Sequence, residues 1–128
     1  PTRLHEKWEI RSVNQALSAS FENNNSRMQW WIRPKETTPM SSSLIVAAAD
    51  ALPPPIFFQS DKIKMAPTID LTIHVRADID SVQWNGASWL LAEFVTNHAS
   101  GGFIEEDGLI WDDAGTLICM SRQLALAR

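Results

Sequence analysis

One acidic residue, Asp50, stands near the end of an otherwise apolar stretch that runs from Leu44 to Leu52. Such a carboxylate could serve as a general base, because burial raises its pKa toward the neutral range. If the stretch is helical, the dipole at the helix C-terminus also disfavours a negative charge there, by roughly 0.3–1 kcal/mol. The simpler alternative is that Asp50 faces solvent at the helix end or bonds a backbone group before Pro53. The residue alone favours that alternative, so a catalytic role needs support from elsewhere in the chain.

The three histidines suggest no catalytic or metal site by themselves. Strand alternation predicts His74 on the same face as Thr68, where a packed or partly exposed ring is the simpler interpretation. His5 and His98 have no acid, cysteine or histidine at the spacing that metal ligands require, so we expect no zinc site. No motif indicates a cofactor, and we expect none.

Two further reactive groups have simple structural interpretations. Glu105, Glu106 and Asp107 form an acid cluster near a turn, which favours a solvated surface over a glycosidase-like carboxylate pair. Cys119 has no base beside it in the sequence, so we expect a buried, inert thiol. The glycine pair 101–102 indicates a turn and not a phosphate loop, because no strand-to-helix context follows it.

Apolar periodicity predicts the elements that would position these groups. The helix is expected from Pro39 to about Leu52, with Thr38 as its N-cap and three prolines at 53–55 preventing its continuation. A hairpin turn is expected over Asp113–Gly115. Strands are expected over His5–Val13, Met28–Arg33, Thr68–Val75, Trp89–His98, Phe103–Asp112 and Thr116–Ala127.

The helix is apolar on most of its surface, so we expect it to be buried nearly all round. The hotdog fold satisfies this demand, because a curved antiparallel sheet wraps one long central helix in it. We therefore predict an α+β hotdog of about six strands, with residues 1–128 forming a single domain.

Composition restricts the partners and the compartment. The net charge of −4 argues against nucleic acid or an anionic membrane as a partner. No apolar run approaches the roughly 20 residues that span a bilayer, and no signal-peptide pattern opens the sequence. A single cysteine excludes an internal disulfide, so a reducing, cytoplasmic setting is expected. The chain begins without Met, on Pro1, so we expect a processed or truncated product.

Several strings, by their order and spacing, resemble the C-terminal half of acyl-CoA thioesterase II, the TesB-like family, and its thioesterase-like relatives. Asp50 is followed by the strings Thr68–His74, Trp89–Leu91, Gly102–Trp111, Asp113–Ile118 and Ser121–Leu126. The resemblance covers most of the chain and is strongest from Leu44 to the end. Members of that family carry two hotdog domains in tandem.

The resemblance implies three catalytic residues. In that family they are an Asp on the helix, a Thr at the start of the next strand and a Gln on the last strand, which correspond here to Asp50, Thr68 and Gln123. They are implied to hold a water that attacks the thioester of an acyl-CoA, releasing CoA and a carboxylic acid. An amide and a hydroxyl can orient such a water or donate to the developing oxyanion. Without the resemblance, Thr68 and Gln123 would be ordinary strand residues.

The family's N-terminal hotdog has no counterpart in this sequence, which leaves alternatives open. A lone half would expose a sheet edge and apolar surface, so we expect a second hotdog as partner, from a homodimer or from a separate N-terminal half. A proteolytic fragment is a third interpretation. Besides an acyl-CoA thioesterase, the chain could be a non-catalytic acyl-CoA-binding or structural hotdog. A hotdog dehydratase ranks last, because it needs a His–Asp pair and only His74 is near.

Overall fold

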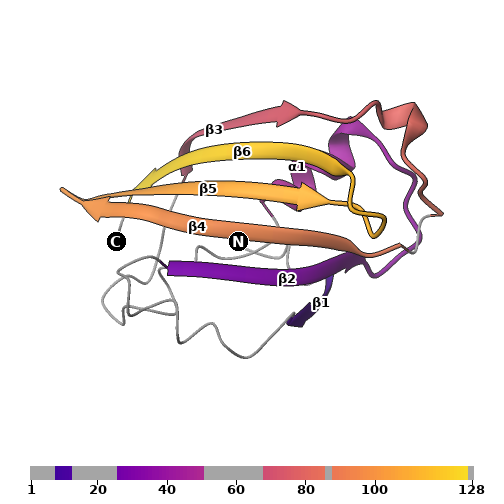
Figure 1. The fold of residues 1–128 in the computed structure, drawn as a ribbon. Coiled ribbons are helices and arrows are strands. Elements are labelled where there is room, and N and C mark those ends of the chain that lie inside the picture. Colours follow the sequence, from indigo (N-terminus) through magenta and orange to yellow (C-terminus); the bar gives the residue numbers. More distant parts are fainter. Residues whose placement is uncertain (1–7, 13–25, 51–67, 86–87, 127–128) are drawn as a thin grey trace.

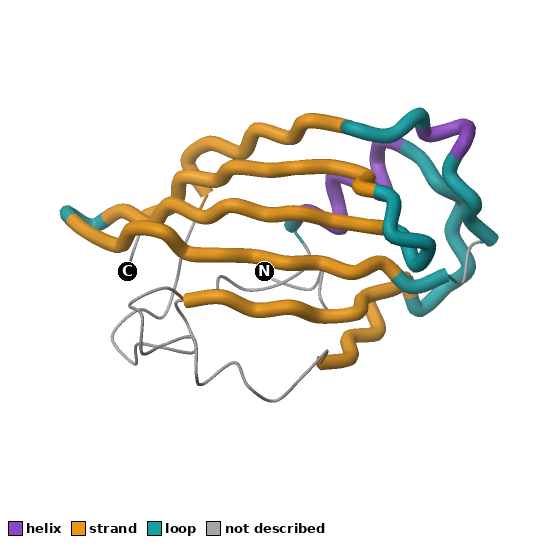
Figure 2. Tube along the Cα trace, in the orientation of Figure 1, coloured by secondary structure: helices purple, strands orange, loops and turns teal. Residues whose placement is uncertain are grey.

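The computed structural model describes residues 8–12, 26–50, 68–85 and 88–126, which form one curved sheet with a helix against one face (Figure 1). The sheet has six strands in the order β1-β2-β4-β5-β6-β3, and all neighbours are antiparallel. The strands are β1 (Trp8–Ser12), β2 (Ser26–Pro34), β3 (Thr68–Val75), β4 (Leu90–Ser100), β5 (Phe103–Trp111) and β6 (Leu117–Leu126). Figure 2 shows the strands side by side, with the helix behind them. This is the α+β layer arrangement that the sequence predicts.

The helix α1 (Ser42–Ala49) begins later than predicted and has eight residues. Ser41 is its N-cap, because the Ser41 hydroxyl accepts the backbone N–H of Leu44 at 3.1 Å. The prediction of Thr38 as N-cap is wrong for a physical reason. The carbonyl of Thr38 accepts the indole N–H of Trp84 at 2.7 Å, and its hydroxyl donates to the carbonyl of Glu36. Both groups are therefore engaged outside the helix.

Burial of α1 is one-sided. Leu44, Ile45, Ala48 and Ala49 are buried, whereas the side chain of Val46 is 49% exposed. The expectation of burial nearly all round is therefore wrong. The small side chains of Ala48 and Ala49 let the helix lie close to the sheet. In the described part of the chain, no helix has the length and hydropathy of a membrane span.

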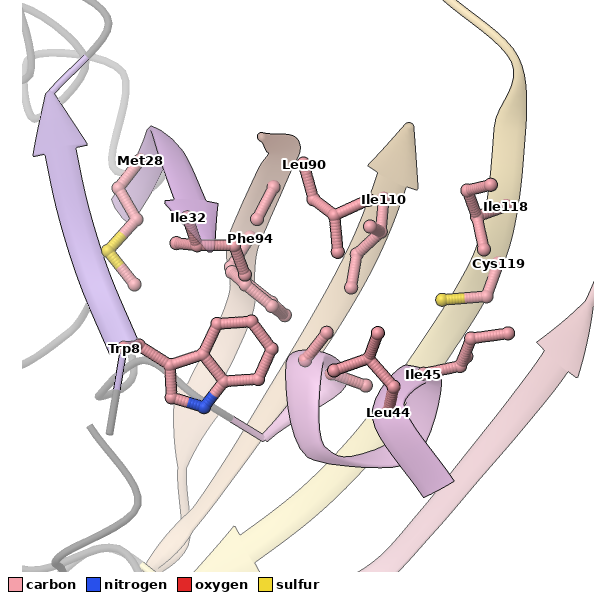
Figure 3. Close-up of a cluster of buried hydrophobic side chains, with 13 residues drawn as sticks. Trp8, Met28, Ile32, Leu44, Ile45, Leu90, Phe94, Ile110, Ile118 and Cys119 are labelled. Atoms are coloured by element: carbon pink, nitrogen blue, oxygen red, sulfur yellow. The ribbon is translucent and has the colours of Figure 1, made fainter. Parts of the chain in front are cut away.

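The core lies between α1 and the sheet. Figure 3 shows Leu44 and Ile45 directed at strand side chains from across the sheet. The largest of these are Trp8, Met28, Ile32, Leu90, Phe94, Ile110 and Ile118. Burying each such side chain stabilises the fold by about 1.5–3 kcal/mol. Cys119 belongs to the same cluster, and burial raises the pKa of its thiol to about 11. It is the buried, inert cysteine that the sequence predicts.

Two hairpin turns set the register of the three central strands. Gly101 and Gly102 join β4 to β5 with φ angles of 62° and 83°, which favour glycine. Between β5 and β6, the Asp112 carboxylate accepts two backbone N–H groups, and Gly115 adopts a φ of 91°. Both turns were predicted. They hold β4, β5 and β6 in a fixed register, which decides which side chains meet.

Candidate active site

A row of polar side chains crosses the helix-facing side of the sheet. Thr96 on β4 lies opposite Glu106 on β5, and Glu106 lies opposite Gln123 on β6. All three are buried. Residues directly opposite in an antiparallel pair share a face, with Cβ atoms about 4.5–5.5 Å apart. Thr96 and Glu106 alternate in phase with the core residues Phe94 and Ile110, so the row faces the helix side.

Thr68 joins this row through a β-bulge at the start of β3. It lies opposite Ala125, whereas Asp70 lies opposite Leu124, so Ile69 is an extra residue on the β3 side. The bulge turns Thr68 toward the inner face. There its hydroxyl accepts a hydrogen bond from the side-chain Nε2 of Gln123. The structure thus brings two of the three implied residues into direct contact.

Because of the same bulge, His74 lies on a different face of the sheet from the one predicted. Beyond the bulge, Leu71 lies opposite Gln123 on the inner face, and His74 lies opposite Met120 on the outer face. The prediction that His74 shares the face of Thr68 is therefore wrong, because simple alternation does not count the extra residue. His74 is exposed, as the simpler interpretation held.

Asp50 is the C-cap of α1. Its backbone N–H donates to the carbonyl oxygens of Ala47 and Ala48. Ala51 and Leu52, the last residues of the predicted helix, lie outside the described residues. The Asp50 side chain keeps contact with solvent, yet partial burial raises the pKa of its carboxyl above the ordinary value. Within the described residues the carboxylate forms no hydrogen bond with Thr68 or Gln123. Asp50 interacts with the polar row electrostatically, because its negative charge raises the pKa of Glu106.

Glu106 is the member of the site that the sequence interpretation missed. Its side chain is 6% exposed, and its Oε2 has no hydrogen-bond partner in the described part of the chain. Burial raises the pKa of Glu106 to about 8, and the negative charges of Asp50 and Asp107 add to this effect. The expectation of a solvated acid cluster is wrong for this residue.

Alternation along β5 carried the signal that would have found it. Every second residue from Ile104 to Ile110 is buried, and Glu106 is one of them. Glu105 and Asp107 point to the other face, where the Arg122 guanidinium binds Asp107 through two hydrogen bonds. Three consecutive acids are typical of a solvated surface, but in a strand the side chain of the middle residue lies on the face opposite to its two neighbours.

The chemistry available at this site is acid–base and hydrogen-bonding chemistry. Two carboxyl groups, Asp50 and Glu106, lie close enough for their charges to interact. The negative charge of Asp50 disfavours the ionisation of Glu106. The hydroxyl of Thr68 and the amide of Gln123 are the hydrogen-bonding groups of the site. Among the described residues, no three His, Cys, Asp or Glu side chains gather as metal ligands would.

Comparison with protein families identifies the family of this chain. The family described as the acyl-CoA thioesterase C-terminal domain matches residues 2–127. The chain therefore belongs to this family, and the resemblance found in the sequence is confirmed. No match was found among curated proteins.

Solved structures give the fold its name. A hot dog fold protein of unknown function from Alicyclobacillus acidocaldarius has a TM-score of 0.80 at 19% identity, over 96% of this chain and 46% of that one. Acyl-CoA thioesterase II TesB2 from Mycobacterium marinum has a TM-score of 0.72 at 22% identity, over 100% and 51%. The protein smu.793 from Streptococcus mutans, bound to acetyl CoA, has a TM-score of 0.67 at 10% identity, over 94% and 89%.

These likenesses establish the fold, and the predicted hotdog is confirmed. The chain spans about half the length of the first two of these proteins.

Proposed function

We propose that this chain hydrolyses the thioester bond of an acyl-CoA, with Asp50, Thr68 and Gln123 as its catalytic residues. The observation that carries the proposal is the hydrogen bond from Gln123 to Thr68, made by a strand bulge in a chain of the thioesterase family. The bulge directs Thr68 to the helix-facing side, where it meets Gln123. Bulges often lie next to active sites, where they re-aim a side chain, so function explains this pair better than packing does.

In the proposed reaction, the Asp50 carboxylate takes a proton from a bound water. The water oxygen forms a bond to the thioester carbonyl carbon, the carbon–sulfur bond breaks, and the proton passes to the CoA sulfur. A raised pKa makes Asp50 a stronger base than an ordinary carboxylate, so its direction of shift supports this role. No covalent bond to the protein is required, because a thioester is activated enough for a positioned water.

Thr68 and Gln123 have positioning and electrostatic roles in this proposal. The amide of Gln123 fixes the Thr68 hydroxyl by donating to its oxygen, which leaves the hydroxyl proton free for another acceptor. That acceptor is the attacking water or the oxyanion that develops on the carbonyl oxygen. A donor held in place before the reaction stabilises such charge without reorganisation.

Residues 1–128 would act as one hotdog domain paired with a second hotdog. Support comes from β3, which lies at the edge of the described sheet and exposes Ile69 (52%) and Val75 (47%). Exposed apolar edge strands invite pairing with another chain. The partner is a second copy of this chain or a separate N-terminal half. The cytoplasmic setting is also part of the proposal and rests on the single cysteine, Cys119.

The test is CoA release from a panel of acyl-CoAs of increasing chain length. Asp50→Asn is expected to lower kcat by at least about 100-fold, since general bases contribute about 10²–10⁴-fold. Asp70→Asn is the matched control, because Asp70 is an exposed acid on the outer face of β3. Equal rates for wild type and Asp50→Asn would reject Asp50 as the base.

The second candidate is a non-catalytic hotdog that binds acyl-CoA or serves as an assembly partner. The observation that favours it is the position of Asp50, whose side chain is exposed and forms no hydrogen bond with Thr68 or Gln123 among the described residues. Calorimetric binding of a non-hydrolysable acyl-CoA analogue, with no release of CoA from any substrate, would establish this candidate. A dehydratase is disfavoured by the outward position of His74.

A further inference from the structure

We infer that Glu106, in its protonated form, is a positioning residue that holds the Gln123 amide in the orientation from which it donates to Thr68. For its effect on rate, the inference rests on the proposed thioester hydrolysis. Its geometry rests on the register of β5 and β6, which places Glu106 directly opposite Gln123 on the helix-facing side. Glu106 Oε2 lacks a partner among the described residues, so it is available to Gln123.

The argument starts from the amide. In a glutamine side chain, Nε2 only donates and Oε1 only accepts. Since Gln123 Nε2 donates to Thr68, Oε1 remains as the acceptor of this amide. A protonated Glu106 supplies an O–H group, whereas an ionised Glu106 supplies only acceptors and would repel Oε1. The proton on Glu106 therefore selects one of the two amide orientations.

The charges near Glu106 favour the protonated state. Asp50, at the end of α1, and Asp107, the next residue on β5, are the two acids whose charges act on it. Both are negative and add to the cost of burying a second carboxylate. With a pKa of about 8, Glu106 is mostly protonated at pH 7.

The flanking strands provide no opposing charge. β4 places Thr96 opposite Glu106, and β6 places Gln123 there, and neither side chain titrates. The neighbouring cation on β6, Arg122, lies on the outer face, where it binds Asp107. In the described part of the chain, the two cross-strand neighbours of Glu106 are therefore Thr96 and Gln123, which are uncharged and can both donate and accept hydrogen bonds.

Ionisation of Glu106 has a defined consequence. Above pH 8 the carboxylate accepts from Gln123 Nε2, and the amide turns so that its Oε1 faces Thr68. The Thr68 hydroxyl then donates to Oε1, and its proton is withdrawn from the water or the oxyanion. Hydrolysis therefore falls as pH rises through about 8.

The first test is the pH profile of kcat/KM after subtraction of the uncatalysed rate. Wild type is expected to lose activity with a midpoint near pH 8. Glu106→Gln is expected to lose this alkaline limb, because its amide donates to Gln123 at every pH. Glu106→Ala is expected to lower the neutral rate by about 10–100-fold, as a misplaced catalytic group does. Glu105→Gln, which changes an outer-face acid next in the chain, is the matched control and keeps the wild-type profile.

The second test does not depend on activity. NMR signals of the Gln123 side-chain NH₂ group, assigned by their loss in Gln123→Ala, are followed from pH 5 to pH 10. The inference expects a shift with a midpoint near pH 8 in wild type and none in Glu106→Gln. A Gln123 amide that does not titrate, or an alkaline limb that persists in Glu106→Gln, overturns the inference. If wild type hydrolyses no acyl-CoA, the proposed function fails, and the amide titration still decides the role of Glu106.

Discussion

Glu106 links the stability of this protein to pH. Its pKa is about 8 in the folded state, against an ordinary value of 4.5, so between these values the folded state binds more protons than the unfolded state. The free energy of unfolding must therefore fall as pH rises from about 4.5 to about 8. The contribution is fully present at low pH and lost above pH 8, and amounts to a few kcal/mol.

Replacing Glu106 by Gln should remove this slope. At pH 9 we expect Glu106→Gln to unfold at a higher denaturant concentration than wild type, because no carboxylate is buried. Urea titrations between pH 5 and pH 9 measure the effect. Glu105→Gln should retain the wild-type slope, and parallel pH dependences for wild type and Glu106→Gln would contradict the raised pKa.

At the scale of elements, the strands were predictable and the details of the site were not. Alternating apolar residues and two glycine turns specify β4, β5 and β6 locally. The carbonyl of Thr38, the predicted N-cap, accepts instead from Trp84, which is 46 residues away in the sequence. The face of Thr68 depends on a bulge that alternation cannot reveal. Asp50, Thr68 and Gln123 were reached through resemblance to a family and not through their own properties.

The corrected start of α1 is testable with two matched substitutions. Ser41→Ala should lower the free energy of unfolding by about 1 kcal/mol, because the Leu44 N–H loses its side-chain acceptor. Thr38→Ala should cost much less, since that hydroxyl bonds only an exposed carbonyl at Glu36. Chemical denaturation of both variants measures the difference. A larger loss of stability for Thr38→Ala than for Ser41→Ala would contradict Ser41 as the N-cap and favour Thr38.

At the scale of the whole molecule, the two edges of the sheet that the described residues form differ. β1 forms one edge with five residues, and β3 forms the other with eight. The β3 edge carries Ile69 and Val75 as exposed apolar side chains, and Leu124 and Phe103 on nearby strands are also exposed. A longer apolar edge is the better template for pairing with a second sheet.

We expect the chain to sediment as a dimer and the double variant Ile69→Lys/Val75→Lys to sediment as a monomer. Charges on an edge strand oppose pairing, because a paired edge would bury them. Ile10→Lys, an exposed apolar residue on the β1 edge, should leave the dimer intact. Analytical ultracentrifugation distinguishes the three proteins. A dimer lost only in Ile10→Lys would place the contact on β1.

The bulge at Thr68 also has a consequence for changes in chain length. Deleting one residue from a strand normally turns every side chain on one side of the deletion to the opposite face. Ile69 is an exception, because it is the unpaired extra residue, and without it Thr68 can still lie opposite Ala125. Deletion of Ile69 should therefore leave the bond from Gln123 to Thr68 in place and keep every other β3 side chain on its face, whereas deletion of Leu71 would turn Asp70 to the inner face, opposite Gln123. Comparison of the two deletion variants by NMR of the Gln123 amide would show that β3 tolerates a shorter chain at this one point.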